Sequence, residues 1–236
     1  MARVVLVTGG TRGIGYAVAE ALLRAGDTVA ITGTTDDGVV KAEHALSSLD
    51  AGPVTGIVCD VRNASSAELA VRTVIAKYGG LDVLVNSAGV GVGAPISDLP
   101  HDEWDRIIGT NLTGVFNCCK AAIPHLKTRG GGWIVNISSL ASTNPFPGGA
   151  AYCASKAGLN AFSDALMQEL RDDNIRVTSI LPGSVATGFS GRESNSGADW
   201  KLLPEDVADA IVDVLSHRAR SLPSRIEIRP AKPKRG

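Results

Sequence analysis

The chain lacks the residue patterns that mark metal centres, disulfide scaffolds and membrane spans. Only four of its 236 residues are cysteine, and they form no CxxC pair and no cluster with histidine. We therefore expect no metal site, and free thiols predict a reducing compartment such as the cytoplasm. No charged leader precedes a long apolar run, so neither a signal peptide nor a membrane-spanning helix is expected.

The chain also has no large excess of charge of either sign. Its formal net charge is −1, which favours neither nucleic acid nor a membrane surface as a partner. The basic tail RPAKPKRG is interpreted as a solvated end, because short basic runs often occur without a binding role.

Motifs of several other catalytic classes are missing. A Ser-His-Asp hydrolase would carry a G-x-S-x-G elbow, which this sequence does not contain. No Gly-Lys-Ser/Thr follows the glycine-rich loop near the start, so a kinase or ATPase loses its main support. Cys153 has no histidine near it in any motif, which disfavours a thiol nucleophile.

Apolar residues make up 44% of the chain, enough for the core of one α/β domain over residues 1–236. Apolar and β-branched runs predict strands at residues 3–8, 28–32, 54–60, 81–86, 132–138, 176–181 and 224–228. Amphipathic patterns predict helices at residues 13–25, 36–49, 65–78, 102–129, 150–173 and 204–217.

Several predicted strands, VVLV and LDVLV among them, are apolar throughout. Such runs are typical of strands buried on both faces of a parallel sheet. Their alternation with helices predicts an α/β fold with a doubly wound parallel sheet, whose ligands bind beyond the carboxyl ends of the strands. The stretch at residues 187–203, rich in Ser, Gly and Asn, is a candidate flexible lid over a substrate.

A glycine-rich loop, TGGTRGIG at residues 8–15, follows the first predicted strand and opens the first predicted helix. Gly9, Gly13 and Gly15 allow a tight turn and a close approach of the backbone to a ligand. The helix N-terminus supplies free N–H groups and a partial positive charge, which suit a pyrophosphate. This context predicts a dinucleotide-binding site.

Further motifs follow this loop in a characteristic order. They are CDV at 59–61, NSAG at 86–89, GTNLTG around Asn111, NISS at 136–139, YCASK at 152–156 and PGSVAT at 182–187. Together they resemble the short-chain dehydrogenases/reductases, from residue 3 to about residue 182. The resemblance implies a Rossmann fold, a nicotinamide cofactor and the interconversion of a ketone and an alcohol.

The resemblance also implies a set of cofactor contacts. Asp60 would bond the adenine amine, while Val185 and Thr187 would contact the nicotinamide carboxamide. Ser87 replaces the second Asn of the family's commoner NNAG, and we expect the cofactor-facing turn to survive. The implied contact residues are Gly9, Thr11, Arg12, Gly13, Ile14, Gly15, Thr34, Asp60, Val61, Asn86, Ala88, Gly89, Tyr152, Lys156, Pro182, Gly183, Val185 and Thr187.

The end of the second predicted strand bears on the choice between NAD and NADP. Members of the family that prefer NAD usually carry an acid where Gly33 stands, and the acids Asp36 and Asp37 are expected to begin the next helix instead. Arg12 can reach a 2′-phosphate in a charge-assisted contact, and Thr34 can donate a hydrogen bond to it. We therefore predict NADP(H).

Tyr152 and Lys156 are four residues apart and share one face of a predicted helix. An ammonium about 4 Å from the phenol oxygen would attract a phenolate by roughly 4 kcal/mol. That attraction would lower the tyrosine pKa by up to about 3 units, towards neutral pH. Tyr152 is thus the predicted general acid–base, and the resemblance implies that Lys156 also holds the nicotinamide ribose.

Two polar residues complete the predicted catalytic set. By the family's spacing to the tyrosine, Ser139 rather than Ser138 would hydrogen-bond the substrate carbonyl oxygen. The resemblance implies that Asn111 binds a water that links Lys156 to solvent. A local kink, or a buried hydrogen bond of a mid-helix asparagine, is the alternative for Asn111.

These residues predict an NADP(H)-dependent carbonyl reductase or alcohol dehydrogenase. General similarity favours the 3-oxoacyl-carrier-protein reductases, whereas residues 202–230 look more like the serine/3-hydroxy acid dehydrogenases. A 3-oxoacyl compound, a small 3-oxo acid and a general ketone all stay open as substrates. The alternative is a non-catalytic NADP(H)-sensing protein, which would be expected to lack Tyr152, Lys156 or Ser139. The resemblance also implies a homodimer or homotetramer.

Overall fold

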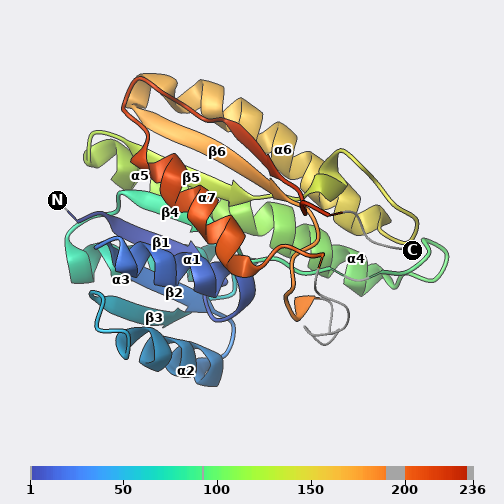
Figure 1. Ribbon diagram of the computed structural model, residues 1–236, viewed down its shortest axis with the longest axis horizontal. Coiled ribbons are helices and arrows are strands. Elements are labelled where there is room, and N and C mark those ends of the chain that lie inside the picture. Colours follow the sequence, from blue (N-terminus) through green and yellow to red (C-terminus); the bar gives the residue numbers. More distant parts are fainter. Residues whose placement is uncertain (1, 92, 190–199, 233–236) are drawn as a thin grey trace.

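A computed structural model describes residues 2–91, 93–189 and 200–232 (Figure 1). Its strands are β1 (Val4–Thr8), β2 (Thr28–Gly33), β3 (Val54–Val58), β4 (Val83–Asn86), β5 (Gly132–Ile137), β6 (Ile175–Pro182) and β7 (Arg225–Ile228). The α-helices are α1 (Gly13–Arg24), α2 (Asp36–Ser47), α3 (Ala64–Tyr78), α4 (His101–Ile108), α5 (Gly114–Thr128), α6 (Ala150–Leu170) and α7 (Pro204–Ser216).

The seven strands form one parallel sheet in the order β3-β2-β1-β4-β5-β6-β7. Every residue of β1 and of β4 is buried, because helices cover both faces of the sheet. The predicted doubly wound α/β fold, a Rossmann-like single domain, is therefore confirmed. No helix within the described ranges is both long and apolar enough to cross a bilayer.

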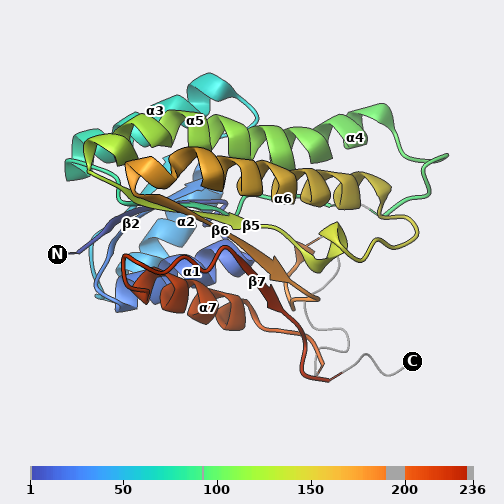
Figure 2. The ribbon, with the colours of Figure 1, turned by 90° about the horizontal axis from the view of Figure 1, so that it is seen from above.

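Two hydrophobic clusters lie on opposite faces of the sheet. One joins side chains of α1, α2 and α7 to the strands, and the other joins α3, α5 and α6 to the strands. Figure 2 shows these two sets of helices as separate layers above and below the sheet. The layered packing holds the carboxyl ends of the strands at one edge, where the chain order reverses between β1 and β4.

The helix predicted at residues 102–129 is interrupted. α4 and α5 are joined by a π-helical turn at Gly109–Thr113, in which the N–H of Gly114 bonds the carbonyl of Gly109. Glycine and asparagine are weak helix formers, and a π-turn often marks a functional position in a helix. The prediction of one uninterrupted helix is therefore wrong at this turn, which contains Asn111.

Candidate active site

A cleft of about 2060 Å³ opens beyond the carboxyl ends of the strands. Except for Asn86 and Asn111, every residue predicted to be catalytic or to bind the cofactor lines it. The loops after β1, β4, β5 and β6 supply most of its wall. Within the described ranges, no three His, Cys, Asp or Glu side chains gather as the ligands of a metal ion would.

The glycine loop packs directly against the turn that follows β4. Gly9 has a φ of 65°, and a side-chain carbon there would lie 2.7 Å from the Cα of Ala88. A side-chain carbon added at Gly15 would collide with the carbonyl oxygen of Gly9. Side chains are thus excluded from both positions, which leaves the loop backbone and the start of α1 facing the cleft.

A threonine that sequence reasoning missed fixes the neighbouring turn. The Thr8 hydroxyl accepts hydrogen bonds from the backbone amides of Ser87 and Ala88, each at 3.1 Å. Its position at the end of β1, opposite NSAG, was the available signal. Because these bonds use the backbone of residue 87, serine in place of asparagine leaves them intact.

The Asn86 side chain does not reach the cleft. It is only 2% exposed, and its Nδ2 donates to Asn136 Oδ1 at 2.8 Å and to Cys119 Sγ at 3.4 Å. Asn86 therefore ties β4 to β5 inside the core, and a cofactor contact by its side chain is not supported.

The end of β2 leaves little room for a side chain. A carbon added at buried Gly33 would lie 2.5 Å from the Cγ2 of Thr11. Arg12 and Thr34 are exposed at the same end of the cleft, and Arg12 precedes α1 without a side-chain capping bond. As predicted, Asp36 and Asp37 stand in the first turn of α2.

Asp60 lies at the cleft but already has a partner. Arg62 Nη2 lies 2.6 Å from Asp60 Oδ2, and the hydrogen bond from Arg62 is the largest cause of the lowered pKa of this carboxyl group. The Asp60 side chain is 37% exposed, so its carboxylate is also open to a ligand. Val61 lines the cleft beside it.

The side chain of Asn111 is fully buried and its amide protons are both used. Its Oδ1 accepts from Val90 N at 2.9 Å, while its Nδ2 donates to Val90 O at 2.9 Å and Ser155 Oγ at 3.0 Å. Asn111 thus holds the segment after NSAG against α6. The buried hydrogen bond considered as its alternative role is present, and a bridging water would bond an atom of this residue other than Nδ2.

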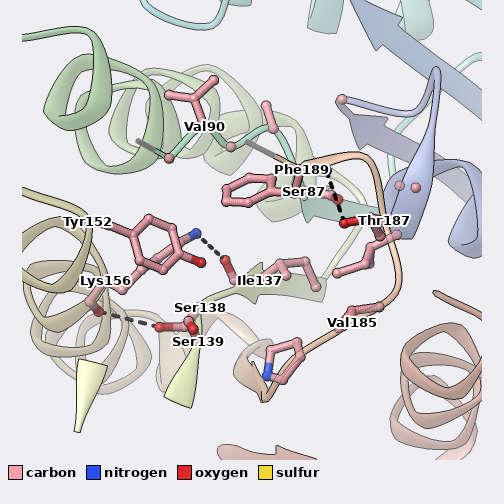
Figure 3. Close-up of a pocket in the computed structure, with 18 of the residues that line it drawn as sticks. Ser87, Val90, Ile137, Ser138, Ser139, Tyr152, Lys156, Val185, Thr187 and Phe189 are labelled. Atoms are coloured by element: carbon pink, nitrogen blue, oxygen red, sulfur yellow. Dashed lines mark hydrogen bonds between the residues drawn. The ribbon is translucent and has the colours of Figure 1, made fainter. Parts of the chain in front are cut away.

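Lys156 is 5% exposed and points towards the end of β5 (Figure 3). Its Nζ donates to the carbonyl oxygen of Ile137 at 2.7 Å and lies 5.9 Å from the centre of the Tyr152 ring. Burial lowers the pKa of Lys156 to about 8, because desolvation penalises the ammonium. Most of its charge is therefore kept at neutral pH.

The expectation that Lys156 lowers the pKa of Tyr152 is wrong for this structure. Burial raises the pKa of the phenol above its ordinary value, and the nearby Ser139 hydroxyl opposes this only in part. The ammonium is bonded to Ile137, and desolvation of the phenolate is the larger effect. Tyr152 is therefore a neutral phenol at neutral pH.

The two candidate serines have different environments. Ser138 is 3% exposed, and its Oγ donates to the carbonyl oxygen of Lys156 at 3.3 Å. Ser139 Oγ accepts from the backbone amide of Ala141 at 3.1 Å, and this hydroxyl is near enough to the Tyr152 phenol to lower its pKa. Because Ser138 is committed to α6, the geometry supports Ser139 as the serine that meets a substrate.

The PGSVAT loop forms the opposite wall of the cleft. Gly183 N donates to Ile228 O at 2.8 Å, and Val185 forms a parallel bridge with Leu202. Beyond Thr187, the ring of Phe189 meets the Tyr152 ring edge-on at 5.8 Å, a contact that sequence reasoning missed. Residues 190–199 of the lid predicted at 187–203 lie outside the described residues.

Comparison with known proteins agrees with this geometry. The family model for short chain dehydrogenases matches residues 3–197. The chain belongs to the short-chain dehydrogenase/reductase family. It is 33% identical over 231 residues to a 3-oxoacyl-(acyl-carrier-protein) reductase of Chlamydia muridarum, covering 94% of this chain and 93% of the relative.

Two further members of the family are similar along nearly the whole chain. A 3alpha-hydroxysteroid dehydrogenase of Mediterraneibacter gnavus is 36% identical over 228 residues, covering 92% of this chain and 91% of the relative. The structure of an alcohol dehydrogenase from Thermococcus sibiricus, complexed with 5-hydroxy-NADP, superimposes with a TM-score of 0.92 at 28% identity and covers 100% of both chains. Short-chain dehydrogenases/reductases of this similarity thus carry names for different substrates.

Proposed function

We propose that this oxidoreductase is an NADP(H)-dependent carbonyl reductase that also runs as an alcohol dehydrogenase. One observation carries the proposal: Tyr152, Lys156 and Ser139 converge at the inner end of a cleft whose other end is a glycine loop. A proton donor, a fixed cation and an oxygen-binding hydroxyl are the groups that a ketone reduction requires.

The cleft fits a nicotinamide dinucleotide. Gly9, Gly15 and the N-terminus of α1 would hold the pyrophosphate, because both glycines line the cleft and no acid stands in the first turn of the helix. Asp60 and Val61 would contact the adenine. Thr11, Gly13, Ile14, Ala88, Gly89, Pro182, Gly183, Val185 and Thr187 line the path between the two ends.

The preference for NADP(H) over NAD(H) rests on the end of β2. Residue 33 is a glycine tightly packed against Thr11, so no acid stands there to bond a ribose 2′-hydroxyl. Arg12 and Thr34 are exposed at the same place and would receive a 2′-phosphate. The alcohol dehydrogenase of Thermococcus sibiricus is complexed with an NADP derivative, which agrees with this proposal.

A reduced nicotinamide held in the cleft would supply the hydride. Tyr152 gives its phenolic proton to the carbonyl oxygen, and its raised pKa keeps that proton in place until the oxygen gains negative charge. Ser139 donates a hydrogen bond to the same oxygen. Lys156, still protonated at neutral pH, would hold the nicotinamide ribose.

The substrate is a ketone, with a 3-oxoacyl compound or 3-oxo acid as the leading candidates. Similarity to the Chlamydia muridarum reductase favours the acyl substrate. The steroid-dehydrogenase relative has comparable identity, so a general ketone is the second candidate. The apolar rings of Phe146 and Phe189 in the cleft suit the hydrocarbon part of any of these substrates.

We also propose a homodimer or homotetramer in the cytoplasm. α5 presents Phe116 at 46% exposure, and α4 presents Trp104 at 37% exposure. An interface between copies through these two helices would cover both side chains. Analytical ultracentrifugation of the purified protein tests this assembly, and a monomer at micromolar concentration would contradict it.

A panel assay tests the enzymatic proposal against the sensor. Purified protein is mixed with NADPH and with acetoacetyl thioesters, 3-oxo acids, ketosteroids and simple ketones, and the absorbance of NADPH is followed. Consumption with at least one class, lost in Tyr152→Phe, supports the reductase. Tight NADPH binding without turnover on any class would favour the non-catalytic sensor instead.

A further inference from the structure

The last residues of β5 are bonded one after another to a single face of α6. Asn136 Nδ2 donates to Ser163 Oγ at 2.8 Å, and Lys156 Nζ donates to Ile137 O at 2.7 Å. Ser138 Oγ donates to Lys156 O at 3.3 Å, as Figure 3 shows for the last two pairs. This polar seam joins the strand that leads to Ser139 to the helix that carries Tyr152.

Ser139 continues the seam through two further residues. Its carbonyl oxygen accepts the Ser142 hydroxyl at 2.5 Å, and Ser142 Oγ lies 2.7 Å from Asn160 Nδ2. The direction of both bonds follows from the donors present. A carbonyl only accepts, so the single proton of Ser142 goes to Ser139, and Asn160 must donate to the free lone pair of Ser142.

Asn160 has features that packing alone does not explain. Its side chain is 6% exposed, and its Oδ1 is buried without a hydrogen-bond partner among the described residues. An unpaired buried amide oxygen lowers stability, so an apolar side chain would suit a purely structural position better. Asn160 also stands one turn after Lys156 and two turns after Tyr152, on the same helix face.

We infer that Asn160, acting through Ser142, is a positioning residue that sets where Ser139 stands relative to Tyr152. The inference rests on the proposed reductase function. The 3₁₀ turn at Leu140–Ser142 places the Ser139 hydroxyl, and Asn160 anchors that turn to α6. The Ser139 hydroxyl and the Tyr152 phenol are thereby both held in position by α6. The reaction needs such a fixed distance between the group that binds the carbonyl and the proton donor.

Two single variants break the chain of bonds at different points. Asn160→Leu removes the donor at similar volume, and Ser142→Ala removes the bridging hydroxyl at a half-buried turn. Each is expected to lower kcat by about tenfold or more while the Kd for NADPH stays unchanged, because only the carbonyl-binding group shifts. Ser142→Thr keeps the hydroxyl and should recover most of the rate.

The control variant is Ser163→Ala. Ser163 is 2% exposed on the same helix and bonds the seam at Asn136, away from the Ser139 turn. Its kcat should stay within about threefold of the parent protein. An equal loss of kcat in Ser163→Ala and Ser142→Ala would mean that general loosening of the seam is the cause, and it would overturn the inference.

A double-mutant cycle separates this inference from the proposed function. In a Ser139→Ala background, Ser142→Ala and Asn160→Leu should add little further loss, because the group they position is gone. Full losses in both backgrounds would overturn the positioning role and leave the reductase proposal standing. An unchanged kcat in Ser139→Ala itself would instead overturn the reductase assignment of that serine. Should Asn160→Leu fail to fold, the Ser142 variants complete the cycle.

Discussion

At the inner end of the cleft, Lys156 and Ser138 are buried and hydrogen-bonded, and buried Asn111, which does not line the cleft, holds Val90 of its wall. At the outer end, Arg12 and Thr34 are exposed, and Arg12 has no side-chain capping bond. The groups proposed to react are thus held by hydrogen bonds within the protein, whereas the groups proposed to bind the 2′-phosphate are exposed to solvent. Proton transfer requires its donor and acceptor to be held at a fixed distance. Attraction of a phosphate by Arg12 needs only an accessible positive charge.

The pKa values follow the same division. Burial raises the pKa of Tyr152 and lowers that of Lys156 to about 8, so at neutral pH the phenol is neutral and the amine keeps most of its charge. The carboxyl of Asp60, at the outer end, has a lowered pKa because Arg62 bonds it. Desolvation is therefore the main cause of the pKa shifts at the inner end, whereas a hydrogen bond from Arg62 is the main cause of the shift at Asp60.

The largest effect is expected from a substitution of the proposed proton donor at the inner end of the cleft. Tyr152→Phe removes the proton donor but keeps the ring that meets Phe189, so kcat for ketone reduction should fall by about 10²–10⁴-fold. The Kd for NADPH, measured by fluorescence titration, should be nearly unchanged. Turnover at the parental rate would refute the role of Tyr152 as the acid.

A second prediction concerns the pH dependence of stability at the inner end. The pKa of Lys156 is about 8 in the folded protein and 10.5 without perturbation, so the unfolded chain binds more protons between these values. The free energy of unfolding should rise with pH in this window by up to about 3 kcal/mol relative to Lys156→Met. Urea denaturation of both proteins from pH 7.5 to 10.5 measures the difference. Parallel pH profiles would show that the lysine is not desolvated.

At the outer end, Arg12→Ala should weaken NADPH binding by about 10- to 100-fold and NADH binding much less, because one charge-assisted contact to phosphate is lost. Arg62→Ala is the matched control, since Arg62 also lines the cleft but its guanidinium is paired with Asp60. Its loss should affect both dinucleotides alike. Equal losses of NADPH and NADH in Arg12→Ala would count against the choice of NADP(H).

The last prediction, with the smallest expected effect on function, tests whether a side chain fits at Gly33 at the end of β2. Gly33→Ala brings a methyl group against the Cγ2 of Thr11 and should lower stability by about 1–3 kcal/mol. The double variant Thr11→Ser/Gly33→Ala removes that methyl contact and should recover part of the loss, as read from thermal unfolding. A Tm unchanged by Gly33→Ala would mean that the end of β2 can accommodate a side chain.

The fold was predictable because its signals are local. Apolar runs such as VVLV identify strands buried on both faces, and the alternation with helices sets the layers. The glycine loop and the Tyr152–Lys156 spacing each lie within a few residues of sequence. The cleft residues named from these motifs accordingly come together around one edge of the sheet.

Contacts between distant segments could not be read from the sequence. The inward turn of Asn86 depends on Asn136, fifty residues later, and the bonds of Asn111 depend on Val90 and Ser155. The pKa of Tyr152 was mispredicted for the same reason. Helical spacing places Lys156 on the same face, but it does not reveal the carbonyl of Ile137, nor how deeply the phenol is desolvated.

The π-helical turn at Gly109–Thr113 behaves as a one-residue insertion in an otherwise continuous rod. Each residue of an α-helix turns the chain by roughly 100°, so shortening this turn by one residue would rotate α4 relative to α5 by that amount. Asn111 would then leave Val90, and the loop beside the reacting groups would lose its anchor. The extra residue in the π-turn thus sets the rotation of α4 relative to α5 at which Asn111 faces Val90.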